Sequence, residues 1–212
     1  MLLSIETRFK HPFTCVVAGP TGSGKTNFIE KFLKFLPDMM VPVPEEVIFC
    51  YGEYQRAYER IRKSNSKVFF TEGLPKIEDY TDDIRRLIII DDLMNEADTR
   101  VSQLFTKGSH HRNFSILFVV QNLFVQNKVQ RTINLNSHYI VLFKNPRDVS
   151  QITHLAKQMY PGRVGYMQEA YKLATSQAYG YLLVDLKQDT SDEVRLRTNI
   201  FPEQQQVVYV PK

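Results

Sequence analysis

The chain has few of the features that mark membrane-spanning, secreted or disulfide-rich proteins. No run of apolar residues exceeds five or six, so the sequence predicts no membrane-spanning helix. The opening residues lack the long apolar stretch of a secretory signal, and we expect no secretion signal. The only two cysteines, Cys15 and Cys50, both fall in expected buried strands, which favours free thiols in a reducing compartment over a disulfide.

What the chain does contain indicates one globular domain. Its 212 residues suffice to bury a core, and its 43% hydrophobic and 12% aromatic residues are typical of folded proteins. The formal net charge of +4 permits an anionic partner without requiring one. We expect a single domain over residues 1–212, with a core at about 12–160, a C-terminal hairpin extension at about 161–202 and a short tail at 203–212.

Short, continuously apolar segments alternate with helical patterns along the chain. Such segments are typical of parallel strands that are buried on both faces. We expect strands at residues 13–18, 46–51, 67–70, 87–90, 115–120 and 138–143, and helices at 26–33 and 53–63. Residues 180–186 and 193–197 flank a polar turn and predict an antiparallel hairpin at the edge of the same sheet. The expected fold is therefore α/β, with a mainly parallel central sheet flanked by helices and a C-terminal antiparallel hairpin.

Residues 19–26 read GPTGSGKT, a complete G-x-x-x-x-G-K-[ST] pattern for phosphate binding. The pattern stands between an expected strand and an expected helix, so that backbone N–H groups and the helix dipole would face a nucleotide's phosphates. Gly22 and Gly24 allow the backbone to approach closely. Lys25 would contact the β- and γ-phosphates, and the Thr26 hydroxyl would bind Mg²⁺. The expected nucleotide-binding residues are Gly19, Pro20, Thr21, Gly22, Ser23, Gly24, Lys25, Thr26 and Asn27.

Four aliphatic residues followed by two acids form a second motif at residues 87–92. A Walker B strand has this pattern, because the buried strand carries its first acid to the Mg²⁺ site. We assign Asp91 to the metal, directly or through coordinated water, and Asp92 to orienting or deprotonating the attacking water. Glu96 is a competing base if the turn after the strand folds back.

More than fifty residues with strand patterns separate the two motifs. This placement favours the additional-strand branch of P-loop ATPases over the kinase–GTPase branch. The chain has no Asn-Lys-x-Asp guanine signature and no Leu-Ser-Gly-Gly signature of transporter ATPases. No Arg-rich lid of the kind that a nucleotide kinase needs follows the second motif. The residues alone therefore predict a P-loop enzyme that hydrolyses a nucleoside triphosphate to drive motion.

Two further polar residues lie where an additional-strand ATPase would use them. Gln121 ends an expected strand and would sense the nucleotide near the γ-phosphate, or else bond to a loop backbone. Arg112 precedes the same strand and would act across a subunit interface as an arginine finger, or else lie on a surface turn. The neighbouring His110 and His111 have no Cys or acid at ligand spacing, which favours a solvated or interface pair over a metal site.

Five segments together resemble the poxvirus-type genome-packaging ATPases of the HerA/FtsK superfamily, as in Maverick/Polinton elements and adintoviruses. The segments are residues 19–26, 88–96, 105–113, 117–124 and 135–148, and the similarity extends from about residue 12 to 202. The resemblance implies a RecA-like motor that uses ATP and Mg²⁺ to drive double-stranded DNA into a preformed capsid. The superfamily often has Asp-Glu at Walker B where this chain has Asp91 and Asp92, which leaves the base open between Asp92 and Glu96.

The resemblance also implies a homo-oligomeric ring, because a finger supplied in trans requires a neighbouring subunit. DNA would thread the ring and be held through its phosphates without sequence specificity, and capsid portal or vertex proteins would be further partners. We expect the protein in the host nucleus or a viral factory, associated with the virion during assembly and not with a membrane. Candidate DNA contacts, for which a solvated helix face is the alternative, are Arg56, Arg60, Arg62, Lys63, Lys67, Lys107, Lys128 and Arg131.

Two other functions stay open at this point. One is a HerA-like DNA translocase or helicase in repair or segregation, which additional DNA-recognition domains would favour. The other is a nucleotide-binding assembly protein with little turnover. Rates of ATP hydrolysis with and without double-stranded DNA distinguish all three.

Overall fold

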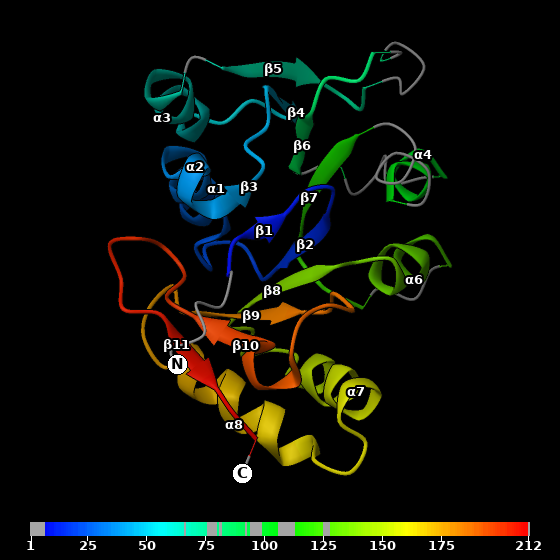
Figure 1. Ribbon diagram of the computed structural model, residues 1–212, viewed down its shortest axis with the longest axis vertical. Coiled ribbons are helices and arrows are strands. Elements are labelled where there is room, and N and C mark those ends of the chain that lie inside the picture. Colours follow the sequence, from blue (N-terminus) through cyan, green and yellow to red (C-terminus); the bar gives the residue numbers. More distant parts are fainter. Residues whose placement is uncertain are drawn as a thin grey trace.

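A computed structural model of the chain describes residues 7–65, 67–75, 80, 82–91, 93, 99–105, 113–124 and 128–211. Figure 1 shows the arrangement of its elements. In chain order they are β1 (Phe9–Lys10), β2 (Thr14–Ala18), α1 (Lys25–Lys34), α2 (Leu36–Met39), β3 (Met40–Val41), β4 (Glu46–Tyr51), α3 (Ala57–Ser64), β5 (Val68–Glu72), β6 (Arg86–Asp91), α4 (Thr99–Gln103), β7 (Phe114–Val120), α6 (Lys128–Leu135), β8 (Tyr139–Phe143), α7 (Ser150–Met159), α8 (Val164–Ala174), β9 (Tyr181–Asp185), the 3₁₀ turn η4 (Asp192–Val194), β10 (Leu196–Thr198) and β11 (Val207–Tyr209).

A nine-stranded sheet in the order β11-β10-β9-β8-β2-β7-β6-β4-β5 runs along the long axis of the molecule (Figure 1). The strands from β8 to β5 are parallel to one another, whereas β9, β10 and β11 continue the sheet in antiparallel pairing. The carboxyl ends of the parallel strands therefore lie together at one edge, here called the carboxyl edge. Their amino ends lie at the opposite edge, here called the amino edge.

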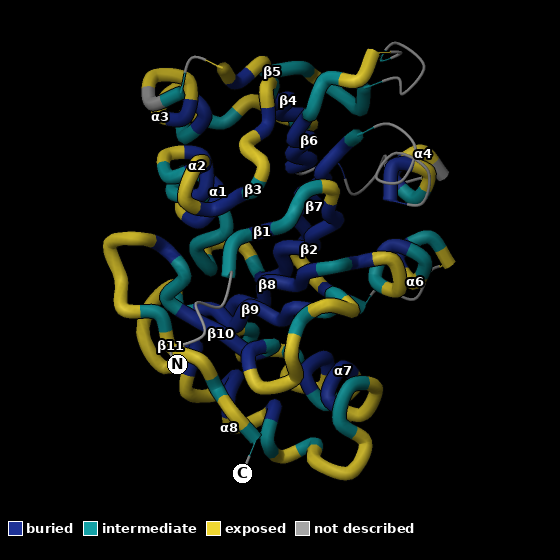
Figure 2. The backbone as a smooth tube through the Cα atoms, viewed as in Figure 1, coloured by how far each residue is buried: buried dark blue, intermediate teal, exposed yellow. Residues whose placement is uncertain are grey.

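Helices cover both faces of the sheet, and successive residues of each central strand alternate between two apolar cores. In β2, Val16 and Ala18 belong to the core that α4, α6, α7 and α8 cover. Cys15 and Val17 belong to the core that α1, α2 and α3 cover. Because both faces are covered, β2, β6, β7, β8 and β9 are buried along their whole length, as Figure 2 shows for the centre of the molecule.

The predicted α/β fold with a mostly parallel sheet and a C-terminal antiparallel hairpin is confirmed. The six predicted parallel strands are present with bounds shifted by no more than two residues, and the two cysteines are free and buried. Three features differ from the expectation. The helix predicted at 53–63 begins at Ala57, helix α8 lies within the expected hairpin extension, and residues 207–209 of the expected tail form β11.

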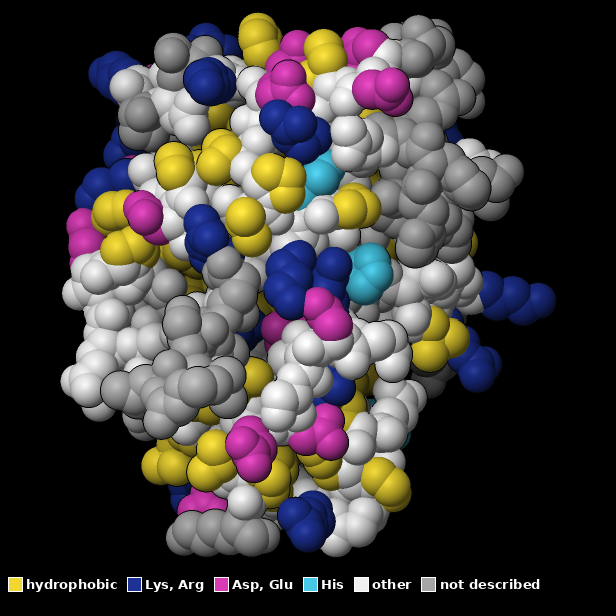
Figure 3. Space-filling model, viewed as in Figure 1, with side chains coloured by type: hydrophobic (Ala, Val, Ile, Leu, Met, Phe, Trp, Pro, Cys, Tyr) yellow, Lys and Arg dark blue, Asp and Glu magenta, His cyan; other side chains and the backbone are white. Residues whose placement is uncertain are grey.

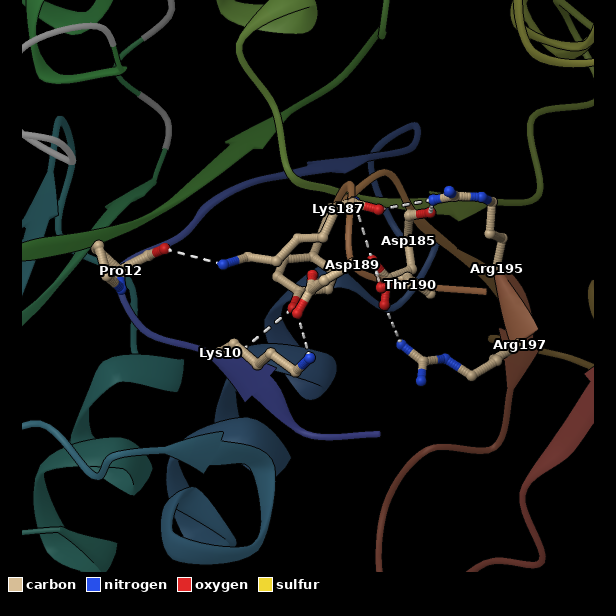
Figure 4. Close-up of polar contacts among 9 residues, drawn as sticks. Lys10, Pro12, Asp185, Lys187, Asp189, Thr190, Arg195 and Arg197 are labelled. Carbon is tan, nitrogen blue, oxygen red and sulfur yellow. Dashed lines mark hydrogen bonds and ion pairs between the residues drawn. The ribbon is translucent and has the colours of Figure 1, made fainter. Parts of the chain in front are cut away.

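Ion pairs and hydrogen bonds at the amino edge connect the C-terminal hairpin to the N-terminal segment (Figure 4). The guanidinium of Arg197 donates to Asp185 Oδ2 at 2.9 Å, and both side chains are almost fully buried. Lys10 pairs with Asp189 at 2.5 Å, and the Lys187 ammonium donates to the carbonyl oxygen of Pro12 at 3.3 Å. The segment that follows β9 is thus bonded to the segment that precedes β2, a central strand of the sheet.

Within the described part of the chain, no helix combines the length and the apolar character that crossing a bilayer requires.

Candidate functional site

The loop at residues 19–26, here called the glycine-rich loop, joins β2 to α1 at the carboxyl edge. Gly22 and Gly24 have φ values of +77° and +110°, which L-residues with side chains rarely adopt. At Gly19 a side chain is excluded by steric crowding. A methyl group built there would lie 2.6 Å from Phe143 Cβ and 2.7 Å from Ser23 Oγ. The loop conformation therefore requires glycine at these three positions.

The N-terminus of α1 opens into the glycine-rich loop. Its first backbone bond runs from Phe28 N–H to the Gly24 carbonyl at 3.0 Å, so the N–H groups before Phe28 have no partner within the helix. The Lys25 ammonium donates to the carbonyl oxygens of Gly19 and Pro20 at 2.6 and 3.0 Å. Ser23 Oγ is buried and has no hydrogen-bond partner among the described residues. Unsatisfied donors, a helix N-terminus and a cation fit a phosphate group.

Asp91 is the last residue of β6, and its side chain is 7% exposed. The Tyr58 hydroxyl of α3 donates to Asp91 Oδ2 at 3.0 Å. Tyr58 is itself fully buried and packs on Phe49 and Phe70, so this bond orients the carboxylate from a rigid position. The helical pattern at residues 53–63 gives no sign of this contact, because Asp91 lies 33 residues beyond Tyr58 in the chain.

The strand order brings the glycine-rich loop and Asp91 to the same edge of the sheet. β7 pairs with β2 on one side and with β6 on the other, so it lies between the strand before the loop and the strand that ends in Asp91. Gln121 follows β7 directly and is exposed. It lines a small cavity together with Ala18 and Gly19. The loop, Asp91 and Gln121 thus extend from three adjacent strands.

Several predicted residues lie outside the described part of the chain. These are Asp92, Glu96, Arg112, the pair His110 and His111, and Lys107.

No group of three or more His, Cys, Asp or Glu side chains in the described ranges could hold a metal ion by itself. Mg²⁺ does not require such a group, because its protein sites often supply one or two carboxylates and leave the other positions to phosphates and water. Thr26 in the first turn of α1 and Asp91 at the end of β6 offer a partial oxygen set of this kind.

Two of the basic residues proposed as DNA contacts interact with neighbouring side chains. Arg60 of α3 pairs with Glu30 of α1 at 3.0 Å, and the Arg62 guanidinium lies 5.2 Å from the centre of the Phe70 ring. Arg56, Lys63 and Lys67 are exposed. On the face drawn in Figure 3, basic side chains are interspersed with acidic ones and form no continuous band.

A scan against protein-family models gives no match to this chain, and a search of curated proteins likewise finds none.

Proposed function

We propose that the chain is a P-loop ATPase that drives double-stranded DNA into a viral capsid. The observation that carries the ATPase part is the position of the glycine-rich loop and Asp91 on either side of β7, at the carboxyl edge. Open α/β sheets bind ligands at this edge. An additional strand between the two motif strands is the defining feature of the additional-strand branch, and β7 has that place in the order, which supports assignment to this branch.

In this proposal the chain's own groups hold the phosphates and the attacking water. N–H groups of the glycine-rich loop donate to phosphate oxygens, and Lys25 exchanges its bonds to the loop carbonyls for the β- and γ-phosphates. Thr26 and Asp91 are the residues that would hold Mg²⁺, which supplies positive charge next to the phosphate oxygens. Asp92 or Glu96 orients the water, and Gln121 responds to the γ-phosphate.

The first experiment measures release of phosphate from Mg·ATP with and without double-stranded DNA. A DNA-packaging motor hydrolyses ATP faster when DNA is present, whereas an assembly protein binds ATP with little turnover. Displacement of a third strand from duplex DNA in an ATP-dependent manner then separates translocation from simple stimulation. Absence of ATP binding to the wild-type chain would overturn the proposal as a whole.

A second experiment assigns the acids. Asp92→Asn should still bind Mg·ATP but hydrolyse it orders of magnitude more slowly, because the metal ligand is retained. Asp91→Asn should instead weaken the dependence of activity on Mg²⁺ concentration. If Glu96→Gln is the variant that binds ATP without cleaving it, the base is Glu96.

The ring and the arginine finger rest on the family resemblance alone, and a mixing experiment tests them. Arg112→Ala subunits should regain part of their activity when mixed with Lys25→Ala subunits, because each supplies a group that its neighbour lacks. An arginine finger contributes about 10³–10⁵ in rate where it has been measured, so the rescue is readily detected. Mixed rings as inactive as either parent would exclude Arg112 as the finger.

DNA contact by the exposed basic residues is tested through salt dependence. Each lysine that touches a phosphate should lower the slope of log K against log salt by about 1 when it is replaced by alanine. We expect this change for Lys63→Ala and Lys67→Ala. Lys172→Ala, an exposed lysine on α8, is the matched control. Equal salt-dependence slopes for all three variants would show that Lys63 on α3 and Lys67 in the turn after it are exposed to solvent and do not contact DNA.

A further inference from the structure

Tyr179 lies beside the glycine-rich loop although most of its side chain is in solvent. The residue is 63% exposed, yet a methyl group built on Gly24 would lie 3.0 Å from Tyr179 Cβ and 3.1 Å from its ring carbon Cδ1. Its φ of +62° is uncommon for a bulky residue. Because so little of the ring is buried, packing against the protein does not account for an aromatic side chain at this place.

The turn that carries Tyr179 is fixed by its backbone. A methyl group on Gly180 would lie 2.4 Å from the Ala174 carbonyl oxygen, and Gly180 N–H donates to the Gln177 carbonyl at 3.1 Å. Tyr181 then begins β9, and its ring packs on Phe28 of α1 with 5.1 Å between centroids. The position of Tyr179 is therefore set relative to the same helix that begins in the glycine-rich loop.

Tyr179 and Asp91 lie on opposite sides of the loop. β2, which leads into the loop, has β7 and then β6 with Asp91 on one side. On its other side lie β8 and then β9, which Tyr179 precedes by two residues. A triphosphate whose terminal end faces Asp91 consequently leaves its sugar and base on the side of Tyr179.

We propose that Tyr179 stacks on the base of the nucleotide whose phosphates occupy the glycine-rich loop. The inference rests on the proposed nucleotide-binding function and adds the residue that recognises the base. Stacking on an aromatic side chain changes affinity by about 5- to 150-fold per base. Since every base has a π-face, Tyr179 distinguishes a nucleoside triphosphate from bare polyphosphate and does not choose between bases.

The test compares binding of Mg·ATP and of Mg·tripolyphosphate by calorimetry. Tripolyphosphate offers the phosphate chain without a base. Tyr179→Asn removes the ring with a residue that tolerates positive φ, and it should weaken ATP binding about 5- to 150-fold without changing tripolyphosphate binding. Tyr179→Phe should retain both affinities. Phe69→Asn makes a similar change at an exposed ring on the edge strand β5 and should leave both affinities unchanged.

The outcomes distinguish failure of base stacking by Tyr179 from failure of nucleotide binding itself. If the wild-type chain binds neither ligand, nucleotide binding itself is wrong and the inference falls with it. If the wild type binds both, and Tyr179→Asn changes both affinities equally or neither, nucleotide binding stands and stacking is overturned. Should the Asn variant fail to fold, Tyr179→Trp introduces the chain's only tryptophan. Its fluorescence should be quenched by Mg·ATP and not by tripolyphosphate, and an equal response to both would exclude stacking.

Discussion

The amino edge and the carboxyl edge of the same sheet differ in how their polar groups are bonded. At the amino edge, side chains form hydrogen bonds and ion pairs with other side chains. His11 contacts Ser115 Oγ at 2.6 Å and Asn113 Oδ1 at 2.8 Å, and Asp185 pairs with Arg197. At the carboxyl edge, Lys25 bonds to carbonyls of its own loop, and backbone N–H groups project from the start of α1.

This difference indicates which edge stabilises the fold and which edge is arranged for a ligand. Bonds at the amino edge join segments far apart in sequence, such as Lys10 and Asp189, so their loss should lower stability. The glycine-rich loop depends on glycines for its conformation, through positive φ values at Gly22 and Gly24 and close packing at Gly19. Removal of the Lys25 side chain at the carboxyl edge should therefore affect activity more than stability, and removal of an ion-paired side chain at the amino edge should do the reverse.

The largest expected effect is on stability at the amino edge. Arg197→Met leaves Asp185 buried without its partner, and it should lower the free energy of unfolding by about 3–5 kcal/mol in urea titrations. Combining it with Asp185→Asn should restore part of the loss, because the buried charge is removed. Lys34→Met breaks a half-exposed pair with Glu203 and should lower the free energy of unfolding far less, because solvent screens this pair. Similar losses for both single variants would show that burial of the Arg197–Asp185 pair does not account for its contribution to stability.

At the carboxyl edge, Lys25→Ala should lower ATP turnover by about 10²–10³-fold, because one preorganised cation is removed from the phosphates. The thermal midpoint should change little, since Lys25 is only partly buried and its ammonium bonds to Gly19 and Pro20 join residues of the same loop. Lys31→Ala on the same helix is the control for loss of a lysine and should retain turnover. A well-folded Lys25→Ala protein with the wild-type rate would exclude the glycine-rich loop as the site.

Gly19→Ala tests the packing of the loop itself. The added methyl group meets Phe143 Cβ, which cannot rotate away, so we expect a loss of about 1–3 kcal/mol in unfolding free energy together with weaker nucleotide binding. Gly165→Ala is the matched control. It lies in α8 with nothing within 4 Å of the added methyl group, and it should stabilise the protein by about 0.5–1 kcal/mol. Loss of stability in both variants would show that the loop is not specially crowded.

The smallest effect concerns pH at the amino edge. Burial lowers the pKa of His11 below its usual 6.5, and the charges of Arg85 and Lys187 lower it further, against the hydrogen bond that the His11 ring donates to Asn113 Oδ1. The unfolded chain therefore takes up a proton at His11 more readily than the folded one, so stability is full above pH 6.5 and declines as the pH falls below it. His11→Gln should flatten this dependence below pH 6.5 in urea titrations. An unchanged pH dependence of stability in His11→Gln would exclude His11 as the group responsible.

Sequence patterns predicted the strands well because burial on both faces leaves continuous apolar runs, as at residues 87–90. The glycine-rich loop between a strand and a helix was predicted equally well, because its sequence pattern is local. Gly22 and Gly24 have the positive φ values that favour glycine. Element boundaries were predicted less well where tertiary packing determines them. The helix predicted at 53–63 begins at Ala57, and β11 pairs with β10 from a segment expected to be a tail.

The sequence by itself determined the α/β class, the parallel strands and the loop that joins β2 to α1, because each depends on residues close together in the chain. Only the tertiary structure decided that β7 lies between β2 and β6, that Tyr58 bonds to Asp91, and that Tyr179 stands against Gly24. These contacts join residues distant in sequence, and they depend on strand order and helix packing. Local sequence patterns do not specify strand order or helix packing, so they cannot predict which distant residues lie next to the candidate site.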